Sequence, residues 1–275
     1  MNKTTVSLIA TAICVLLATI TIAAPKELLL CLPGFPGSQA QAQPFVDKML
    51  RHLESKLKWQ PLSLRGIYIP DGSIAVDKLR EKRPEIALVG PSIYASEHKT
   101  LGMKVIAKIQ VNGRSEEIYS VITRKDGPST LGELVGKKVE GAVVHNEKYV
   151  YNVLLDQQLK PGQLTLESQK RPLKSLRNVV RNKSDAAIVD QSVVDHLSEL
   201  PFANEVQSIY TTKSVPSALV VVMGDGKKQA LKLKSMLVGM CKRPDGKELC
   251  QTLTISAIKA SSNVGCKKLL TRYNR

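Results

Sequence analysis

The chain has 275 residues, of which 43% are hydrophobic and 23% charged. A chain of this length and composition buries a sizeable core, which excludes a disordered or fibrous protein and favours two lobes over one. Its 40 Lys and Arg residues against 24 acids give a net charge of +16, so its surface attracts anions such as nucleic acid, acidic lipid, cell-wall polymer or a small anionic ligand.

A secretory signal peptide is predicted over residues 1–23. Lys3 precedes an apolar run from Val6 to Ile20, and small residues follow up to Ala23, where cleavage is expected. The alternative is a retained membrane anchor, but the apolar run is shorter than the ~20 residues that a spanning helix needs. The protein is therefore expected to be exported, and nucleic acid is not expected as a partner.

Strands and helices alternate along the first part of the chain, which is typical of a parallel sheet covered on both faces. Strands are predicted at 28–32, 62–69, 86–89 and 105–111, and helices at 41–57 and 74–82. The strand at 86–89 runs directly into Gly90-Pro91, and proline suits the first turn of a helix. At such a junction free backbone N–H groups face the space beyond the strand end, where open α/β sheets bind ligands. The pattern predicts one wall of a ligand cleft here.

The alternation starts afresh after a β-branched run at 117–124. The expected elements are a one-turn helix at 130–134, a strand from the turn at 136–141, helices at 147–158 and 172–182, a strand at 185–189 and a returning strand at 206–210. A strand at 217–223 and helices at 227–241 and 247–253 follow. This order predicts an inserted second lobe, with lobe one formed by 24–121 and 207–275 and lobe two by 122–206. The ligand cleft is expected between the lobes, where hinge closure traps a ligand.

Four cysteines remain after the signal peptide, at Cys31, Cys241, Cys250 and Cys266. An even number in an oxidising compartment favours disulfides, and four cysteines permit three pairings. We favour Cys241 with Cys250, because the turn around Pro244 is able to fold them together. The scattered sulfurs have no histidine nearby at ligand spacing, so a zinc site is not expected.

Four motifs, taken together, resemble a known family. They are Gly90-Pro91-Ser92-Ile93-Tyr94, Tyr119-Ser120-Val121-Ile122, the run Thr130 to Val139, and Asp185-Ala186-Ala187-Ile188-Val189. Their order and spacing are similar to type 2 periplasmic solute-binding proteins, and closest to the phosphate/phosphite/phosphonate-binding branch that serves ABC importers. The resemblance implies two α/β lobes, each a mostly parallel sheet flanked by helices, joined by two hinge strands. It also implies a periplasmic location, a ligand in the cleft and no catalysis.

The resemblance also implies a set of ligand-binding residues. The family's Gly-Pro-x-x-Tyr motif places Tyr94 at the ligand with Ser92 beside it, and the acid after the Asp-Ala-Ala strand corresponds to Asp190. The loop after the first strand offers an apolar wall, and the second motif adds the start of a hinge strand. The remaining candidates are Phe35, Tyr119, Ser120 and Asn146. For Tyr94 the alternative is a half-buried tyrosine packed on the sheet edge.

One position departs from the pattern of phosphonate binders. Those proteins have a Ser/Thr-rich helix start that holds the anion, whereas the stretch from Gly141 to Tyr149 contains no Ser or Thr. Glu147 would repel an oxyanion from the first turn, although it also suits the helix dipole. Asn146 either caps the helix or binds the ligand. The ligand is therefore expected to be a small polar or anionic solute, with its identity left open.

We expect a monomeric solute-binding protein that serves an ABC permease and uses no cofactor or metal. One alternative is the same fold acting as a sensor or envelope interaction module. The sequence from Lys227 onward contains twelve Lys or Arg but only two acids, so this region is strongly basic. An enzyme is the other alternative. The chain lacks the Gly-x-Ser-x-Gly, His-Glu-x-x-His and phosphate-loop motifs, so catalysis is not expected.

Overall fold

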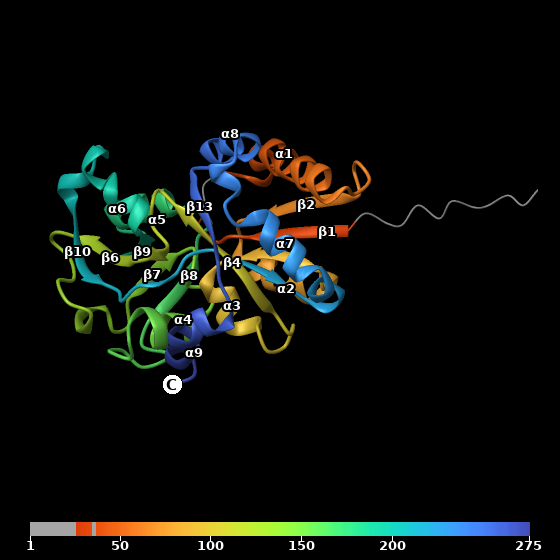
Figure 1. Cartoon of the computed structure of the whole chain (residues 1–275). Coiled ribbons are helices and arrows are strands. Elements are labelled where there is room, and N and C mark those ends of the chain that lie inside the picture. The colour runs from red at the N-terminus through yellow and green to blue at the C-terminus, as the bar shows by residue number, and fades with distance from the viewer. Residues whose placement is uncertain (1–25, 35–36) are drawn as a thin grey trace, which may run out of the picture.

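The structure, a computed structural model, describes residues 26–34 and 37–275. The predicted signal peptide and Phe35 lie outside the described residues. The elements form two α/β lobes that lie side by side, with the orange and blue segments mostly in one lobe and the green segments in the other (Figure 1).

Lobe one is built on a six-stranded sheet with the order β13-β4-β12-β3-β1-β2. Its strands are β1 (Lys26–Cys31), β2 (Leu64–Ile69), β3 (Ile86–Val89), β4 (Lys104–Val111), β12 (Leu219–Val222) and β13 (Ile255–Ala260). β1 pairs in parallel with β2 and β3, which explains its leucine-rich run, because a strand covered on both faces needs no polar side. β12 is antiparallel to β3 and β4, and β13 is antiparallel to β4. The sheet is therefore mixed, with less parallel pairing than the alternating pattern predicts.

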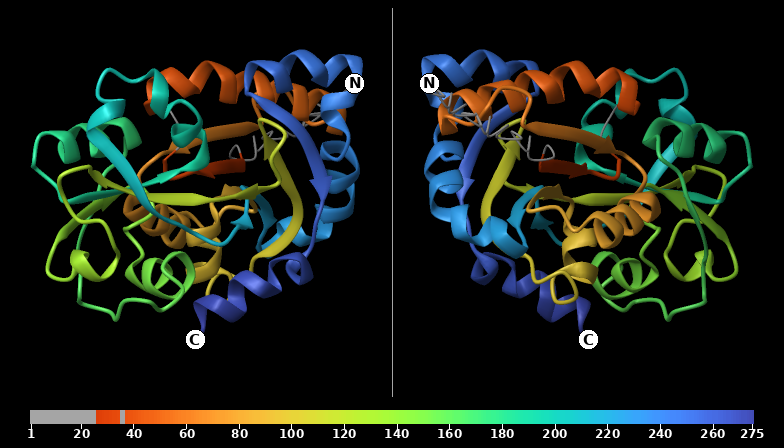
Figure 2. Two further views of the ribbon diagram at one scale, coloured as in Figure 1. Left: turned by 90° about the vertical axis from the view of Figure 1, so that its left-hand side faces the viewer. Right: turned by 90° about the vertical axis from the view of Figure 1, so that its right-hand side faces the viewer.

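In the described part of the chain, six helices cover this sheet. They are α1 (Gln39–Leu57), α2 (Gly72–Lys82), α3 (Pro91–Glu97), α7 (Ala230–Leu237), α8 (Pro244–Thr252) and α9 (Lys267–Tyr273). α1 begins with a capping box in which Ser38 and Gln41 satisfy each other's backbone N–H groups. Helices α1, α7 and α8 lie over one face of the sheet, and α2, α3 and α9 over the other (Figure 2). The hydrophobic side chains of each set pack on the face that the set covers.

Lobe two has a five-stranded sheet with the order β10-β6-β9-β7-β8. Its strands are β6 (Tyr119–Arg124), β7 (Lys138–Gly141), β8 (Thr165–Ser168), β9 (Ala186–Asp190) and β10 (Val206–Thr211). Its helices are α4 (Glu147–Tyr149), which continues into a π-helical turn (Val150–Leu154), α5 (Pro172–Val180) and α6 (Gln191–Asp195). β7 is parallel to β8 and β9, whereas β6 is antiparallel to β9 and β10.

Two short strands pair where the chain crosses between the lobes. β5 (Glu116–Glu117) and β11 (Val215–Pro216) form an antiparallel two-stranded sheet. The outward crossing lies between β4 and β6, and the return lies between β10 and β12. The two-lobed α/β fold with two crossings is as the sequence predicts. The proposed lobe boundaries at residues 121 and 207 stay a prediction.

The predicted helix at 147–158 is wrong in its second half. Its α-helical part stops at Tyr149, and the π-helical turn ends at Leu154. Asp156 and Gln157 adopt positive φ angles of 48° and 65°, which no right-handed helix continues. Asp156 is held there by ion pairs with Lys213 and Arg275, so tertiary contacts override the helical periodicity. The predicted helix at 227–241 also ends early, because α7 stops at Leu237.

The predicted disulfide is confirmed. Cys241 and Cys250 are bonded, with their Cα atoms 5.4 Å apart, and the bond links the segment between α7 and α8 to α8 itself. Within the described chain, Cys31 and Cys266 are buried free thiols.

None of the helices in the described ranges is both long and apolar enough to span a bilayer.

Candidate functional site

The two lobes meet at the starts of α3 and α4. Asn146 caps α4 by accepting a hydrogen bond from the backbone N–H of Tyr149 at 3.0 Å. Its Nδ2 donates across the lobe boundary to the backbone carbonyl of Ser92 at 3.2 Å. Beside it, the ring of His145 packs so closely on Gly72 of α2 that a Cβ at Gly72 would overlap the ring. The lobes are therefore in direct contact on this side.

Helix α9 holds the lobes together at a second place. Although it covers the lobe-one sheet, its Tyr273 carbonyl accepts a hydrogen bond from Asn152 Nδ2 in lobe two at 3.0 Å. The guanidinium group of Arg272 donates to the carbonyl of Val153, and Arg275 pairs with Asp156 at 3.1 Å. α9 lies beside α4 in Figure 1, at the lower edge of both lobes. These contacts hold the two lobes against each other through α9.

An acidic cluster lies where the chain enters lobe two. We define it by Glu117, Tyr119, Tyr149 and Asp190. Burial raises the pKa of Glu117 to about 7, and the charge of Asp190 adds to this shift. Burial also raises the pKa of Tyr119 well above its ordinary value, with further contributions from Tyr149, Glu117 and Asp190. Tyr119 and Asp190 are direct partners in the pairing of β6 with β9, and Glu117 lines the same cavity as both of them.

Asp190 joins this cluster to the loop after β1. Its Oδ1 caps α6 by accepting hydrogen bonds from the backbone N–H of Ser192, at 2.9 Å, and from the Ser192 hydroxyl. Its Oδ2 lies toward Gly34, where an added Cβ would be 4.0 Å away. The same Cβ would lie 3.2 Å from the Cβ of Ala142 in lobe two. A side chain at Gly34 would therefore be in tight contact with lobe two.

Positive charge is scarce at this site. Of the described residues that line the adjoining cavity, Arg114 is the one basic side chain, whereas Glu117 and Asp190 are acidic. Arg114 donates a 2.6 Å hydrogen bond to Asp195 and is thus already paired. The electrostatics favour ligand groups that donate hydrogen bonds or carry positive charge.

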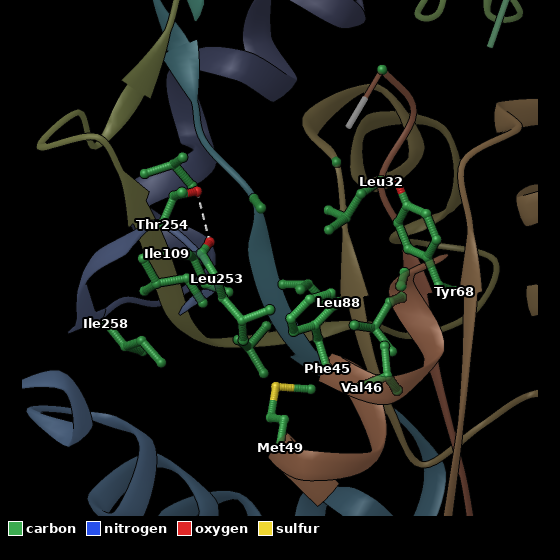
Figure 3. Close-up of a pocket in the computed structure, with 18 of the residues that line it drawn as sticks. Leu32, Phe45, Val46, Met49, Tyr68, Leu88, Ile109, Leu253, Thr254 and Ile258 are labelled. Atoms are coloured by element: carbon green, nitrogen blue, oxygen red, sulfur yellow. Dashed lines mark hydrogen bonds between the residues drawn. The ribbon is translucent and has the colours of Figure 1, made fainter. Parts of the chain in front are cut away.

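A cavity of about 740 Å³ is lined both by Glu117, Tyr119 and Asp190 of the acidic cluster and by residues of lobe one. Figure 3 shows its lobe-one part. Of the predicted site residues, Tyr119 and Asp190 line the cavity. Ser120 is buried in β6 and Asn146 is engaged at the lobe contact. Ser92 and Tyr94 are fully buried on α3 and do not belong to the cavity wall, so the structure brings together only part of the predicted set.

Tyr94 points into the packing between α3 and α9. Its ring lies against that of His98, with the centroids 5.3 Å apart. Burial, and to a smaller extent Cys266, raises the pKa of Tyr94 to about 12. The Tyr94 and Tyr149 hydroxyls and the Ser92 Oγ are buried, and none has a hydrogen-bond partner among the residues that the structure describes. Buried polar groups nearly always have a partner, so these atoms are suited to a bound polar group or water.

Glu117, Tyr149 and Gly34 are site residues that the sequence reasoning missed. The sequence does single out Glu117, because it is an acidic residue directly before a hydrophobic hinge strand. It also singles out Gly34, as part of the Pro-Gly loop after β1. It does not single out Tyr149, because the place of this residue beside Tyr119 depends on how the π-helical turn packs.

The profile of one protein family matches residues 36–264, and it describes the periplasmic substrate-binding protein of phosphonate ABC transporters. This match spans most of the chain. The chain belongs to this family.

Solved structures agree with the phosphonate-binding-protein fold. A binding component of a phosphonate ABC transporter from Pseudomonas aeruginosa is 12% identical, with a TM-score of 0.67 over 91% of this chain and 87% of that one. A Xanthomonas citri protein bound to ATP is 14% identical, with a TM-score of 0.71 over 91% and 98%. PhnD1 from Prochlorococcus marinus, in complex with methylphosphonate, is 13% identical, with a TM-score of 0.68 over 91% and 98%. At these identities the likeness shows the fold alone.

A search of curated protein sequences finds no match to this member of the family. No group of three or more His, Cys, Asp or Glu side chains in the described ranges is arranged to hold a metal ion.

Proposed function

We propose that this solute-binding protein traps a small polar solute between its lobes in the periplasm and delivers it to an ABC permease. The family supports the transport role. The observation that carries the location is the acidic cluster, because Glu117 from the crossing segment and Asp190 from lobe two meet there beside Gly34 of lobe one. A ligand bound at this point touches both lobes and is released when they separate.

The ligand's chemistry follows from the charges at the cluster. Two acids face it, Asp190 and Glu117, whose raised pKa of about 7 leaves it partly protonated near neutral pH, and the nearby guanidinium of Arg114 is paired with Asp195. The start of α4, where phosphonate binders are expected to hold their anion, offers Glu147, whose carboxylate accepts a 3.1 Å hydrogen bond from the Gly162 backbone N–H. We therefore propose a solute with at least one cationic or hydrogen-bond-donating group.

The predicted site residues then divide into two roles. Tyr119 and Asp190 contact the ligand, while Ser92 and Asn146 hold the lobes together through their hydrogen bond. Ser120, Tyr94 and Phe35 stay in the proposed site as untested members. Export through the predicted signal peptide, with cleavage near Ala23, a monomeric state and the lack of enzymatic activity also belong to this proposal.

Thermal-shift screening of the mature chain tests the proposal. The panel contains phosphate, phosphite, phosphonates, sulfur oxyanions, amino acids and small amines, and the hits are repeated on Asp190→Asn and Asp225→Asn. Asp190→Asn keeps an α6 cap but removes the charge, whereas Asp225 is an exposed residue paired with Lys228 outside the cavity wall. Amine-bearing solutes are expected to stabilise wild type and Asp225→Asn, but Asp190→Asn far less. Equal stabilisation of all three proteins, or of none by any solute, would refute the site.

A further inference from the structure

The two faces of the lobe-one sheet are packed to different densities. On β1, Leu29 is fully buried, whereas Leu28 and Leu30 on the opposite face keep 5% and 7% of their surface exposed. The same holds for Leu88 of β3 and Val220 of β12, at 9% and 7%, while their neighbours along each strand are at 0%. Side chains in the middle of a sheet retain such exposure only where a water-sized space lies over them. The sheet face under α1 is therefore hollow.

This hollow is the deep part of the 740 Å³ cavity, and its walls are apolar. Phe45 and Met49 of α1 line it together with Leu88 of β3, Ile109 of β4 and Ile258 of β13 (Figure 3). The volume lies within the range of roughly 300 to 1,000 Å³ typical of ligand pockets. Protein interiors are normally close-packed, and cavities with such linings stay dry and take up apolar molecules. The walls fit a hydrocarbon chain.

The same cavity reaches the acidic cluster. Its lining continues from Leu30 and Leu32 past Gly34 to Glu117 and Asp190. A single molecule is thus able to place a polar end at the carboxylates and an apolar chain over the sheet. At the end of the cavity beside the acidic cluster, Glu117 and Asp190 outnumber Arg114, which is already paired with Asp195. A carboxylate or phosphate head group is therefore disfavoured there.

We infer that the solute of this protein is an amphiphile, with an aliphatic chain in the lobe-one cavity and an amine or alcohol head at Asp190. The head group's position rests on the proposed function, whereas the chain's position rests on the cavity alone. This assigns to lobe one a chain-binding site that a small phosphonate would leave unfilled.

Chain-length series test the inference. Binding of ethylamine, hexylamine and decylamine to the mature protein is measured by calorimetry and thermal shift, with decanol and decanoate as head-group comparisons. Affinity is expected to rise roughly fourfold for each methylene that enters the cavity. Decylamine and decanol are expected to bind more tightly than decanoate, because the carboxylate would face Glu117 and Asp190.

Matched substitutions of two valines test where the aliphatic chain of the ligand binds. Val220→Phe fills the cavity from the sheet, whereas Val264→Phe makes the same change at a residue that is 79% exposed and outside the cavity wall. Ile109→Phe is a second filling variant in case Val220→Phe does not fold, and unliganded melting identifies such a failure. The filling variants are expected to lose the chain-length dependence and to keep ethylamine binding, while Val264→Phe behaves as wild type.

The outcomes separate this inference from the proposed function. If small polar solutes bind but longer chains add nothing, or if the filling variants keep the wild-type dependence, the chain site is refuted and the cleft stands. Suppose instead that affinity rises with chain length in wild type and not in the filling variants, while Asp190→Asn leaves binding unchanged and no small polar solute binds. In that case the chain site stands and the proposed cleft function fails. If neither short nor long compounds bind, both fail.

Discussion

Asn146 Nδ2 lies 3.2 Å from the backbone carbonyl oxygen of Ser92, and this hydrogen bond joins the first turns of helices in different lobes. The Oδ1 of the same side chain caps α4 at the backbone N–H of Tyr149. One amide group therefore serves both the local fold of lobe two and the contact between lobes, each with a different atom.

The two roles of Asn146 are separable by substitution. Asp at this position keeps the accepting oxygen and the cap but cannot donate to Ser92, whereas Ala loses both. Asn146→Asp is expected to retain the melting temperature of lobe two and to weaken ligand binding, because the closed state loses a bond. Asn146→Ala is expected to lose about 1 kcal/mol of stability in addition. Calorimetric binding and denaturant unfolding distinguish them, and identical behaviour of the two variants would contradict this division.

Glu117 is expected to make stability depend on pH. Burial raises its pKa to about 7 in the folded protein, compared with an ordinary value of 4.5. The unfolded chain loses this proton first as pH rises, so Glu117 progressively destabilises the fold between about pH 4.5 and 7. Glu117→Gln, which stays neutral, is expected to exceed wild type by roughly 2 kcal/mol at pH 8.

This difference should vanish near pH 4, where both residues are uncharged. Urea unfolding of wild type and Glu117→Gln at pH 4, 6 and 8 measures it. The exposed Glu116 gives the control, since its carboxylate accepts a hydrogen bond from the Ser214 hydroxyl, and Glu116→Gln removes a neighbouring charge without touching Glu117. A gap between Glu117→Gln and wild type that is constant across pH would contradict the raised pKa.

The sequence reveals the fold because its signals are local. The buried run of β1, the Gly90-Pro91 junction and the alternation of strands and helices each depend on residues close along the chain. The weaker elements escape such reasoning: β13 is a partly exposed edge strand, and α9 is a seven-residue helix whose C-terminal residue, Tyr273, accepts a hydrogen bond from Asn152 of lobe two.

The site is less predictable because its residues come from segments far apart in the sequence: Tyr119 and Asp190 pair across β6 and β9 within lobe two, and Gly34 approaches Asp190 from lobe one. Tyr119 and Asp190 belong to motifs and line the cavity, but Tyr94 turns toward His98 and α9. The period of a strand places Leu28 and Leu30 on the face opposite Leu29, but it does not show which of the two faces borders the cavity. A hollow over one sheet face is a property of how far α1 stands from that face, which the spacing of apolar residues does not encode.

The Cys241–Cys250 disulfide is expected to stabilise lobe one. It closes a loop with a sequence separation of 9 residues, and a loop of this length restricts the unfolded chain by about 2–3 kcal/mol. Replacing both cysteines with serine should lower the melting temperature, and a reducing agent should do the same to wild type only. Thermal unfolding with and without reductant tests this, and an unchanged wild-type melting temperature under complete reduction would show that the bond does not stabilise the fold.

Gly34 and Gly113 offer a matched pair that isolates lobe closure. Both have positive φ angles, +87° and +79°, so an alanine strains the backbone at either position by roughly 1 kcal/mol. Their surroundings differ: a Cβ at Gly34 meets Ala142 of lobe two at 3.2 Å, whereas a Cβ at Gly113 meets no atom within 4 Å in the described chain. Only Gly34→Ala therefore opposes the approach of the lobes.

Both alanine variants are expected to lose similar stability, but only Gly34→Ala is expected to lose ligand affinity. Overpacking of about 1.4 kcal/mol in the closed state corresponds to a roughly tenfold weaker complex. Because Gly34 also borders the cavity, small-angle scattering separates closure from direct ligand contact: without ligand, Gly34→Ala should have a larger radius of gyration than Gly113→Ala. Equal radii combined with weaker binding would assign the effect of Gly34 to the ligand contact instead of to the contact with Ala142.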